Sequence, residues 1–291
     1  MTDFLQTVVL GILLGGVYAL MGSGLTLLFG VMRIVNLAHA VFMIVAAYIA
    51  YYAFELLGID PLLSVLITMP VMFLFGLVVY LPLFPRIEAS PRYVEMTVLV
   101  TFALTLIVEG VLGFLFSNIV RGAKPGYTTD ALLVGGIYIP VGQLLALGMS
   151  VLLLVGLWLF LKYSRIGTAI RATMQNRTSA QIVGVNIRRI SAISFGLGMA
   201  LAGASGSLMS YLFVFYPGQH WRWVALLLAL IVLGGLGSLK GAVIGAIGLS
   251  VISSFVTRWL GPDWSSLTFY LALFIILMVR PQGLFGKTLR V

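Results

Sequence analysis

The sequence predicts an all-α fold, a polytopic transmembrane helical bundle of about eight or nine membrane segments, some of them broken or re-entrant. Of its 291 residues, 61% are hydrophobic and 9% are charged, whereas ordinary soluble domains carry about 25% charged residues. A water-exposed surface does not accommodate so apolar a composition. The apolar residues gather in long runs, and these runs lack the short alternating segments that are typical of an outer-membrane barrel.

Nine apolar runs are candidate spans, because a helix needs about 20 apolar residues to cross a bilayer. They cover residues 4–29, 34–54, 61–85, 96–116, 141–161, 190–216, 223–239, 241–257 and 264–279. The last three runs hold only 16–17 residues and are separated by short Gly-rich or polar joints. We therefore expect one or two of them to be broken or re-entrant.

The whole chain, residues 1–291, is expected to form one transmembrane domain with two long connections. Residues 117–140 contain several turn formers and are predicted to be the main external loop. Residues 162–189 contain six Lys and Arg residues and are predicted to be the main cytoplasmic loop.

The positions of Lys and Arg predict the orientation of the chain, because cytoplasmic connections carry an excess of both. Thirteen of the 17 basic residues fall on one side of the predicted spans. They are Arg33, Arg86, Arg92, Lys162, Arg165, Arg171, Arg177, Arg188, Arg189, Lys240, Arg280, Lys287 and Arg290. This asymmetry predicts an external N-terminus and a cytoplasmic C-terminus, although one re-entrant segment would change the side of the N-terminus. It also explains the net charge of +9 without a nucleic-acid partner.

The cytoplasmic loop has the pattern of short amphipathic helices. Within 166–184, apolar and small residues recur at roughly helical spacing, with Arg and Gln between them. Such helices fit two roles: an interfacial anchor held by membrane lipid headgroups, or a docking surface for a soluble partner steered by basic residues.

One stretch of this loop, RATMQNRTSAQIVGVNIRRI at 171–190, resembles the cytoplasmic loop of LivH-type ABC-importer permeases for branched-chain amino acids. Three other stretches resemble the same family: GGVYALMGSGLTLLFGVMRIVNLAHA (15–40), VLGGLGSLKGAVIGA (232–246) and VRPQGLFG (279–286). The resemblance therefore runs nearly from end to end of the chain. It implies a multi-pass protein of the bacterial inner membrane that imports branched-chain amino acids, or similar small solutes such as urea, short amides or small carboxylates.

The resemblance also implies partners and a coupling site. Ala180, Gly184, Val185 and Asn186 match the family's coupling helix, which inserts into an ATPase subunit, and Arg171, Arg177 and Ser179 lie beside them. More distant ABC permeases often have Glu-Ala-Ala where this chain has Thr178-Ser179-Ala180, so an acidic contact is not expected there. The implied partners are a second related permease, two ATPase subunits that use ATP and Mg, and an extracytoplasmic binding protein.

Nothing in the sequence predicts catalysis or a resident cofactor. The two histidines are far apart and predict no metal site. No acid and base pair is placed for catalysis. Gly286-Lys287-Thr288 lacks the first glycine of a phosphate-binding loop, because Pro281 stands at that position.

Three polar residues within the spans are candidates for the translocation pathway. Glu109 is the only acid well inside a span, and such groups are costly and therefore usually paired or functional. Asn36 and His39 are three residues apart and expected on one helical face, either lining the pathway or bonding two helices together.

Small and hydroxyl residues complete the predicted pathway. Gly235 and Gly237 are expected to help break a helix pair at membrane depth, so that half-helix ends face a cavity. Ser23 is one of several hydroxyls that would make the route polar but uncharged. A self-standing secondary transporter or channel is the alternative, although ion-coupled carriers usually have more intramembrane charges than Glu109 and His39.

Overall fold

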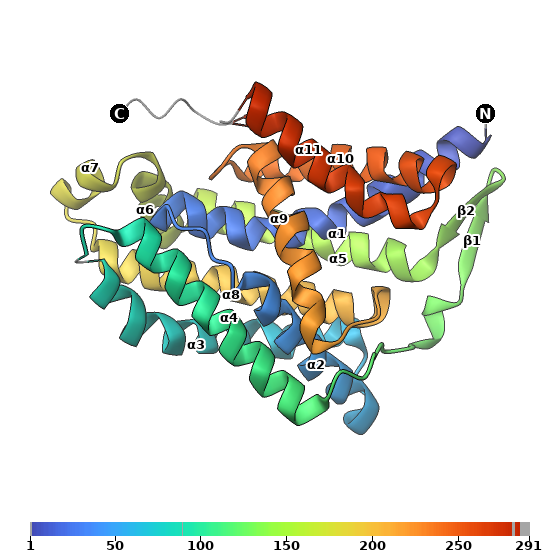
Figure 1. Ribbon diagram of the computed structural model, residues 1–291, viewed down its shortest axis with the longest axis horizontal. Helices are drawn as coiled ribbons and strands as arrows, with labels where there is room; N and C mark the ends of the chain where they lie inside the picture. The colour runs from blue at the N-terminus through green and yellow to red at the C-terminus, as the bar shows by residue number, and fades with distance from the viewer. Residues whose placement is uncertain (1, 89, 281–282, 286–291) are drawn as a thin grey trace.

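The computed structural model describes residues 2–88, 90–280 and 283–285 and shows a bundle of helices (Figure 1). Eight segments are long and apolar enough to cross a membrane by length and composition alone. They are α1 (Thr2–Met32), α2 (His39–Leu57), α3 (Pro61–Ile87), α4 (Tyr93–Phe116), α5 (Val141–Tyr163), α8 (Ile187–Leu212), α10 (Leu239–Leu260) and α11 (Ser265–Val279) with the turn η3 (Pro262–Trp264) before it. The predicted fold class is confirmed.

The shorter elements lie at the two ends of the bundle or cross it. They are η1 (Gly126–Thr128), β1 (Ala131–Val134), β2 (Ile137–Pro140), α6 (Arg165–Gln175), α7 (Arg177–Ile182), η2 (Pro217–Gln219) and α9 (His220–Gly234). In Figure 1, α6 and α7 lie at one end of the bundle and the β1–β2 hairpin lies at the other. Helix α9 runs at a steep angle to α1, α5 and α8. We call these ends the loop end and the hairpin end.

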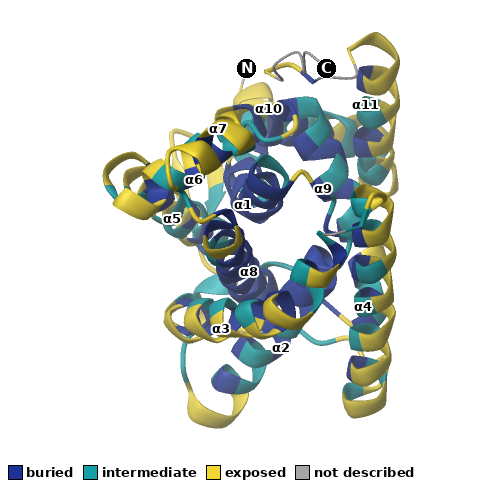
Figure 2. Ribbon diagram, turned by 90° about the vertical axis from the view of Figure 1, so that its left-hand side faces the viewer, coloured by how far each residue is buried: buried dark blue, intermediate teal, exposed yellow. Residues whose placement is uncertain are grey.

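Helices α1 and α8 form the centre of the bundle. α8 is the most buried of the long helices, and it packs against α1, α2 and α3. Figure 2 shows α1 and α8 as mostly buried, with α4 and α11 exposed along the rim. Since lipid tails are as apolar as core side chains, an exposed apolar face is expected wherever a helix meets the membrane or another subunit.

Small residues set the close spacing of α1 and α10, as their small-xxx-small pattern predicts. A Cβ atom added at Gly11 would lie 2.6 Å from the Cα of Val251, and one at Gly15 would lie 2.7 Å from the Cα of Ile247. These two glycines therefore act in packing within the chain.

The predicted start of the span 34–54 is wrong, because the chain is not helical from Arg33 to Ala38. Arg33 has a φ of 56°, which ends α1 in the left-handed region. The Asn36 side-chain oxygen then accepts a hydrogen bond from Ala38 N at 3.1 Å, a local bond that competes with helix formation. Asn36 and His39 consequently do not share a helical face; Asn36 precedes α2, and His39 is its first residue.

Of the three short predicted spans, the one at 223–239 is interrupted. Its helix, α9, has 15 residues, which is about 22 Å of helix and short of a hydrocarbon core of about 30 Å. The neighbouring run at 241–257 belongs to α10, a full helix of 22 residues. The expectation of a broken segment is thus met at α9.

The predicted external loop contains a feature that hydropathy does not indicate. β1 and β2 pair antiparallel, with Val134 opposite Ile137. The two residues between them, Gly135 and Gly136, have φ values of 57° and 80°, as a type I′ hairpin turn requires.

Contacts at each end of the bundle bring together residues far apart in the sequence. At the hairpin end, Arg258 pairs with Asp3 at 2.9 Å. The Tyr127 hydroxyl there donates a hydrogen bond to Asp60 at 2.9 Å, and burial together with this bond raises the pKa of Tyr127. At the loop end, Arg177 pairs with Glu88 at 2.9 Å. Lys287 and Arg290 of the predicted cytoplasmic set, and the Gly286-Lys287-Thr288 triplet, lie outside the described residues.

Candidate functional site

The connection between α5 and α8 is an ordered pair of helices, and capping residues define its joints. Ser164 accepts a hydrogen bond from Gly167 N at 2.8 Å and begins α6. Asn176 accepts from Ser179 N at 2.9 Å and begins α7, and Asn186 accepts from Arg189 N at 3.0 Å and begins α8. Each cap satisfies backbone donors that the first turn of a helix leaves free. The predicted short helices of 166–184 are therefore present.

Gly184 provides the backbone conformation that ends α7. Its φ is 90°, and a Cβ atom there would meet nothing within 4 Å. Glycine is favoured because of this positive φ rather than because space is short. Ala180 is buried, and its carbonyl accepts a hydrogen bond from Val185 N at 3.0 Å, which closes the turn.

The outward surface of this pair of helices includes two residues that the predicted coupling site did not contain. Ile182 is 80% exposed and Val183 is 77% exposed, at the end of α7. Ser179 is exposed as well, whereas Ala180 and Asn186 act in folding the turn. The signal for Ile182 and Val183 was an adjacent β-branched pair in an otherwise polar stretch. We call Ser179, Ile182, Val183 and Gly184 the α7 tip.

The predicted arginines tie this pair of helices to the bundle. Arg171 is exposed and donates a hydrogen bond to the Lys162 carbonyl at the end of α5, at 3.2 Å. Arg177 donates to the Glu88 carboxylate at 2.9 Å, where α3 ends. Beside this ion pair lies a polar hollow of about 450 Å³. It is lined by Glu88, Arg177, Gln181, Val185, Asn186, Ile187 and Arg188.

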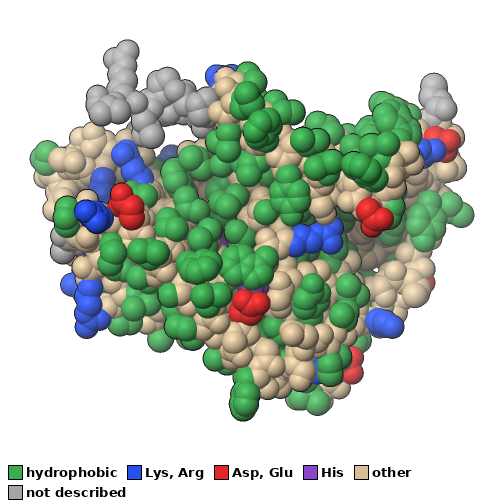
Figure 3. Space-filling model, in the orientation of Figure 1, with side chains coloured by type: hydrophobic (Ala, Val, Ile, Leu, Met, Phe, Trp, Pro, Cys, Tyr) green, Lys and Arg blue, Asp and Glu red, His purple; other side chains and the backbone are tan. Residues whose placement is uncertain are grey.

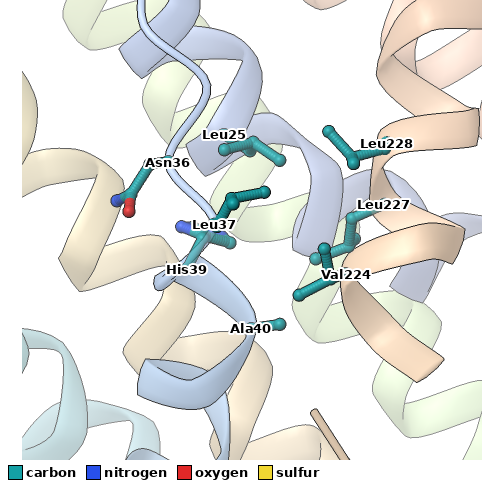
Figure 4. Close-up of a pocket in the computed structure, with 8 residues that line it drawn as sticks. All are labelled: Leu25, Asn36, Leu37, His39, Ala40, Val224, Leu227 and Leu228. Carbon is teal, nitrogen blue, oxygen red and sulfur yellow. The ribbon is translucent and has the colours of Figure 1, made fainter. Parts of the chain in front are cut away.

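A second hollow lies within the bundle, between the start of α2, helix α1 and helix α9 (Figure 4). It is tightly packed and leaves no room for a water molecule. It is lined by Leu25, Asn36, Leu37, His39, Ala40, Val224, Leu227 and Leu228. In Figure 4 the leucines and Val224 point toward one another, while the Asn36 side chain points away from them. The interior of this closed hollow is therefore mainly apolar.

His39 and Ser23 make hydrogen bonds with α1. His39 Nε2 lies 3.2 Å from the Met21 carbonyl, so Nε2–H donates and ties the start of α2 to α1. Ser23 donates to the Leu20 carbonyl at 2.7 Å within α1. Both side chains are buried, and Ser23 is not among the residues that line the hollow.

Gly235 and Gly237 form the joint between α9 and α10, with φ values of 94° and 81°. A Cβ atom at Gly237 would lie 3.2 Å from the Cα of Gly30, two residues before α1 ends. The helix break is thus where the sequence indicated, but it lies near the loop end. Leu284 N donates to the Leu233 carbonyl at 2.8 Å, so the described residues 283–285 pack on this joint.

Glu109 lies on α4, and it faces a histidine that the sequence did not mark as a site residue. His220, the first residue of α9, places its Nε2 atom 3.8 Å from the Glu109 carboxylate. The only sequence signal for His220 was its place just before an apolar run. In the orientation of Figure 1, hydrophobic side chains cover most of the surface and charged ones are sparse in its middle (Figure 3).

Comparison with known proteins gives consistent matches along the chain. A family model described as branched-chain amino acid transport system / permease component matches residues 7–278. The permease BraD of Pseudomonas aeruginosa, from a high-affinity branched-chain amino acid transport system, is 28% identical over 98% of this chain and 96% of its own length. A probable branched-chain amino acid permease, LivH of Methanocaldococcus jannaschii, is 29% identical over 94% and 90%. LivM of Escherichia coli K12 matches at 30% identity over 60% of this chain and 42% of its own length.

Proposed function

Because the chain belongs to the family of permease components of branched-chain amino acid transport systems, we propose that it forms half of the translocation pathway of an ATP-driven importer. The match to residues 7–278 carries this proposal, since it spans the bundle and both hollows. The substrates are branched-chain amino acids or similar small polar solutes. A self-standing carrier or channel does not fit this family.

The proposed assembly contains a second related permease, two ATPase subunits and an extracytoplasmic binding protein. The partial match to LivM supports a second permease, because LivM and the LivH relatives are both named as permease proteins of such systems. ATP and Mg belong to the ATPase subunits, and this chain acts as a transport subunit rather than an enzyme. The cytoplasmic membrane is its proposed location, with the loop end and the C-terminus inside, in accord with the positive-inside rule.

The proposed coupling runs through the α7 tip. An exposed β-branched pair on a short capped helix suits a hydrophobic cleft of a soluble subunit. Movement of α7 would reach α5 through α6, α8 through the Asn186 cap, and α3 through the pair of Arg177 and Glu88. Transport by such a rearrangement needs no catalytic side chain, because it depends on a shift between two conformations of the chain.

The test is to purify the tagged chain gently and reconstitute what accompanies it into vesicles. We expect a second permease and ATPase subunits to co-purify, and L-leucine to enter the vesicles only with ATP on the ATPase side and loaded binding protein on the other. A chain that purifies alone and transports without ATP would contradict the proposal.

The ion pair between Glu88 and Arg177 gives a separate prediction about coupling. Glu88→Gln should lower the number of leucine molecules carried per ATP by about 1.5- to 5-fold, because a partly exposed ion pair contributes about 0.2–1 kcal/mol. ATPase association should persist. Glu88→Arg combined with Arg177→Glu should restore the ratio, and Glu55→Gln, an exposed acid at the opposite end of the bundle, is the matched control. An unchanged ratio in Glu88→Gln would show that the pair is not part of the linkage.

A further inference from the structure

Glu109 and His220 form a pair of polar side chains where α4, on the rim of the bundle, meets the start of α9. Glu109 comes from α4 and His220 from the start of α9, and Nε2 and the carboxylate Oε2 are 3.8 Å apart. That separation is longer than an N–H···O hydrogen bond, which spans about 2.7–3.2 Å. The two groups therefore face each other without a direct bond.

The hydrogen-bond inventory of His220 makes this pair unusual. His220 Nδ1 lies 2.9 Å from the Pro217 carbonyl. A carbonyl oxygen only accepts, so Nδ1 carries a proton, and in the tautomer with this one proton the ring presents a lone pair at Nε2. Nε2 is buried and has no hydrogen-bond partner among the residues that the structure describes. In that tautomer, Nε2 and a carboxylate oxygen are two acceptors that lie side by side.

The surroundings show that this pair is accessible from one side. The His220 side chain is 0% exposed, whereas the Glu109 side chain is 29% exposed. A carboxylate at membrane depth is costly against lipid, so an exposed edge there is expected to face a water-filled route or another subunit. The pair therefore combines a buried wall and an open side, as a ligand site requires.

The pair also lies next to the apolar hollow. His220 and Val224 are four residues apart on α9, so they share a face and are about one turn, or 5.4 Å, apart. Val224, Leu227 and Leu228 line the hollow, together with Leu25 and Leu37. Along α9 toward the loop end, the pair of Glu109 and His220 is thus followed by the apolar side chains that line the hollow.

We propose that Glu109 and His220 Nε2 bind the ammonium group of the amino-acid substrate, with its aliphatic side chain directed into the hollow. This site rests on the proposed function and names which part of the substrate the chain recognises. A primary ammonium nitrogen can sit about 2.9 Å from both acceptors and donate to each. The hollow has no room for a side chain here, so the side chain enters when α9 moves, and α9 lies between the short turn η2 and the glycine joint at Gly235 and Gly237.

The experiment measures equilibrium binding to the complete importer in lipid nanodiscs, with the binding protein omitted. Three probes separate the ligand groups: L-leucine, 3-methylbutylamine, which lacks the carboxylate, and 4-methylpentanoate, which lacks the ammonium group. We expect L-leucine and the amine to bind and the carboxylate to bind weakly or not at all. Glu109→Gln should weaken the first two by roughly 10- to 100-fold, because a charge-assisted bond is lost and the new amide can donate to Nε2 itself.

Controls distinguish a ligand site from a structural contact. Glu95→Gln replaces an exposed acid on the same helix and should bind all three probes as the wild type does. His220→Phe keeps a ring in the buried space but removes the acceptor, so it should also weaken the amine. ATPase activity of the assembled complex should be unchanged in Glu95→Gln, and the yield and size-exclusion profile of the complex report the folding of all three variants.

The outcomes separate this site from the proposed function. If the wild type takes up L-leucine but Glu109→Gln and His220→Phe bind the amine equally well, the site is refuted and the function stands. If 4-methylpentanoate binds as tightly as the amine, the site does not recognise the ammonium group and the proposal is refuted. If the wild-type importer neither binds nor carries amino acids, both proposals fail.

Discussion

Gly206→Val is expected to abolish the folded protein. Gly206 lies on α8 where this helix crosses α2, and a Cβ atom there would overlap the Met43 carbonyl and lie 2.6 Å from the Ala46 Cβ. Two of the three nearest atoms belong to the α2 backbone, so a side-chain rotation cannot relieve the overlap. Overpacking in a dense interior costs about 1–3 kcal/mol, and backbone overlap places this case at or above about 3 kcal/mol.

The measurement is the yield and melting temperature of the detergent-solubilised chain, followed by size-exclusion chromatography. Gly206→Ala should show a smaller loss of the same kind, because it adds only the Cβ. Gly148→Val is the control, since Gly148 lies in α5 and a Cβ there meets nothing within 4 Å. A Gly206→Val protein that melts like the wild type would mean that α2 and α8 are not packed as described.

Replacing Ile182 and Val183 together with aspartate is expected to abolish binding of the ATPase subunits. Both side chains are more than three-quarters exposed at the α7 tip, so the change removes an apolar contact without disturbing the core. Two carboxylates in an apolar cleft would be desolvated without partners, which costs several kcal/mol. A loss of about 4 kcal/mol lowers affinity roughly 1,000-fold.

The measurement is co-purification of the ATPase subunits with the tagged chain, together with membrane insertion judged by carbonate extraction. Ile182→Val with Val183→Ile keeps the apolar surface and is the matched control, which should bind normally. If the aspartate variant retains its ATPase subunits, the loop is a lipid anchor or docks through another face.

The class of fold could be predicted from the sequence because hydropathy is a local and additive property. A run of about 20 apolar residues has few stable places other than a bilayer. The eight long helices follow those runs, and the 15-residue α9 falls in one of the three short ones. The non-helical segment before His39 was missed, since Asn36 forms its backbone bond in a sequence that is otherwise apolar.

The candidate sites divide in the same way. The amphipathic loop could be predicted because periodicity and capping residues such as Asn176 and Asn186 act within a few positions. Glu109 could be identified from the sequence because a carboxylate inside a membrane span is energetically costly. Its partner could not, because His220 is 111 positions away in the sequence, and only the packing of η2, directly before α9, against α4 brings the two together.

The sequence by itself determined that this protein is a helical membrane bundle with one ordered polar loop between α5 and α8. Those properties depend on the free energy of transferring short segments from water, and the residues of each segment determine that free energy. Only the tertiary structure decided that Ile182 and Val183 face outward, that Glu88 holds Arg177, and that Glu109 faces a histidine. Such pairings depend on how helices approach one another, and close backbone contacts at residues such as Gly206 set that approach.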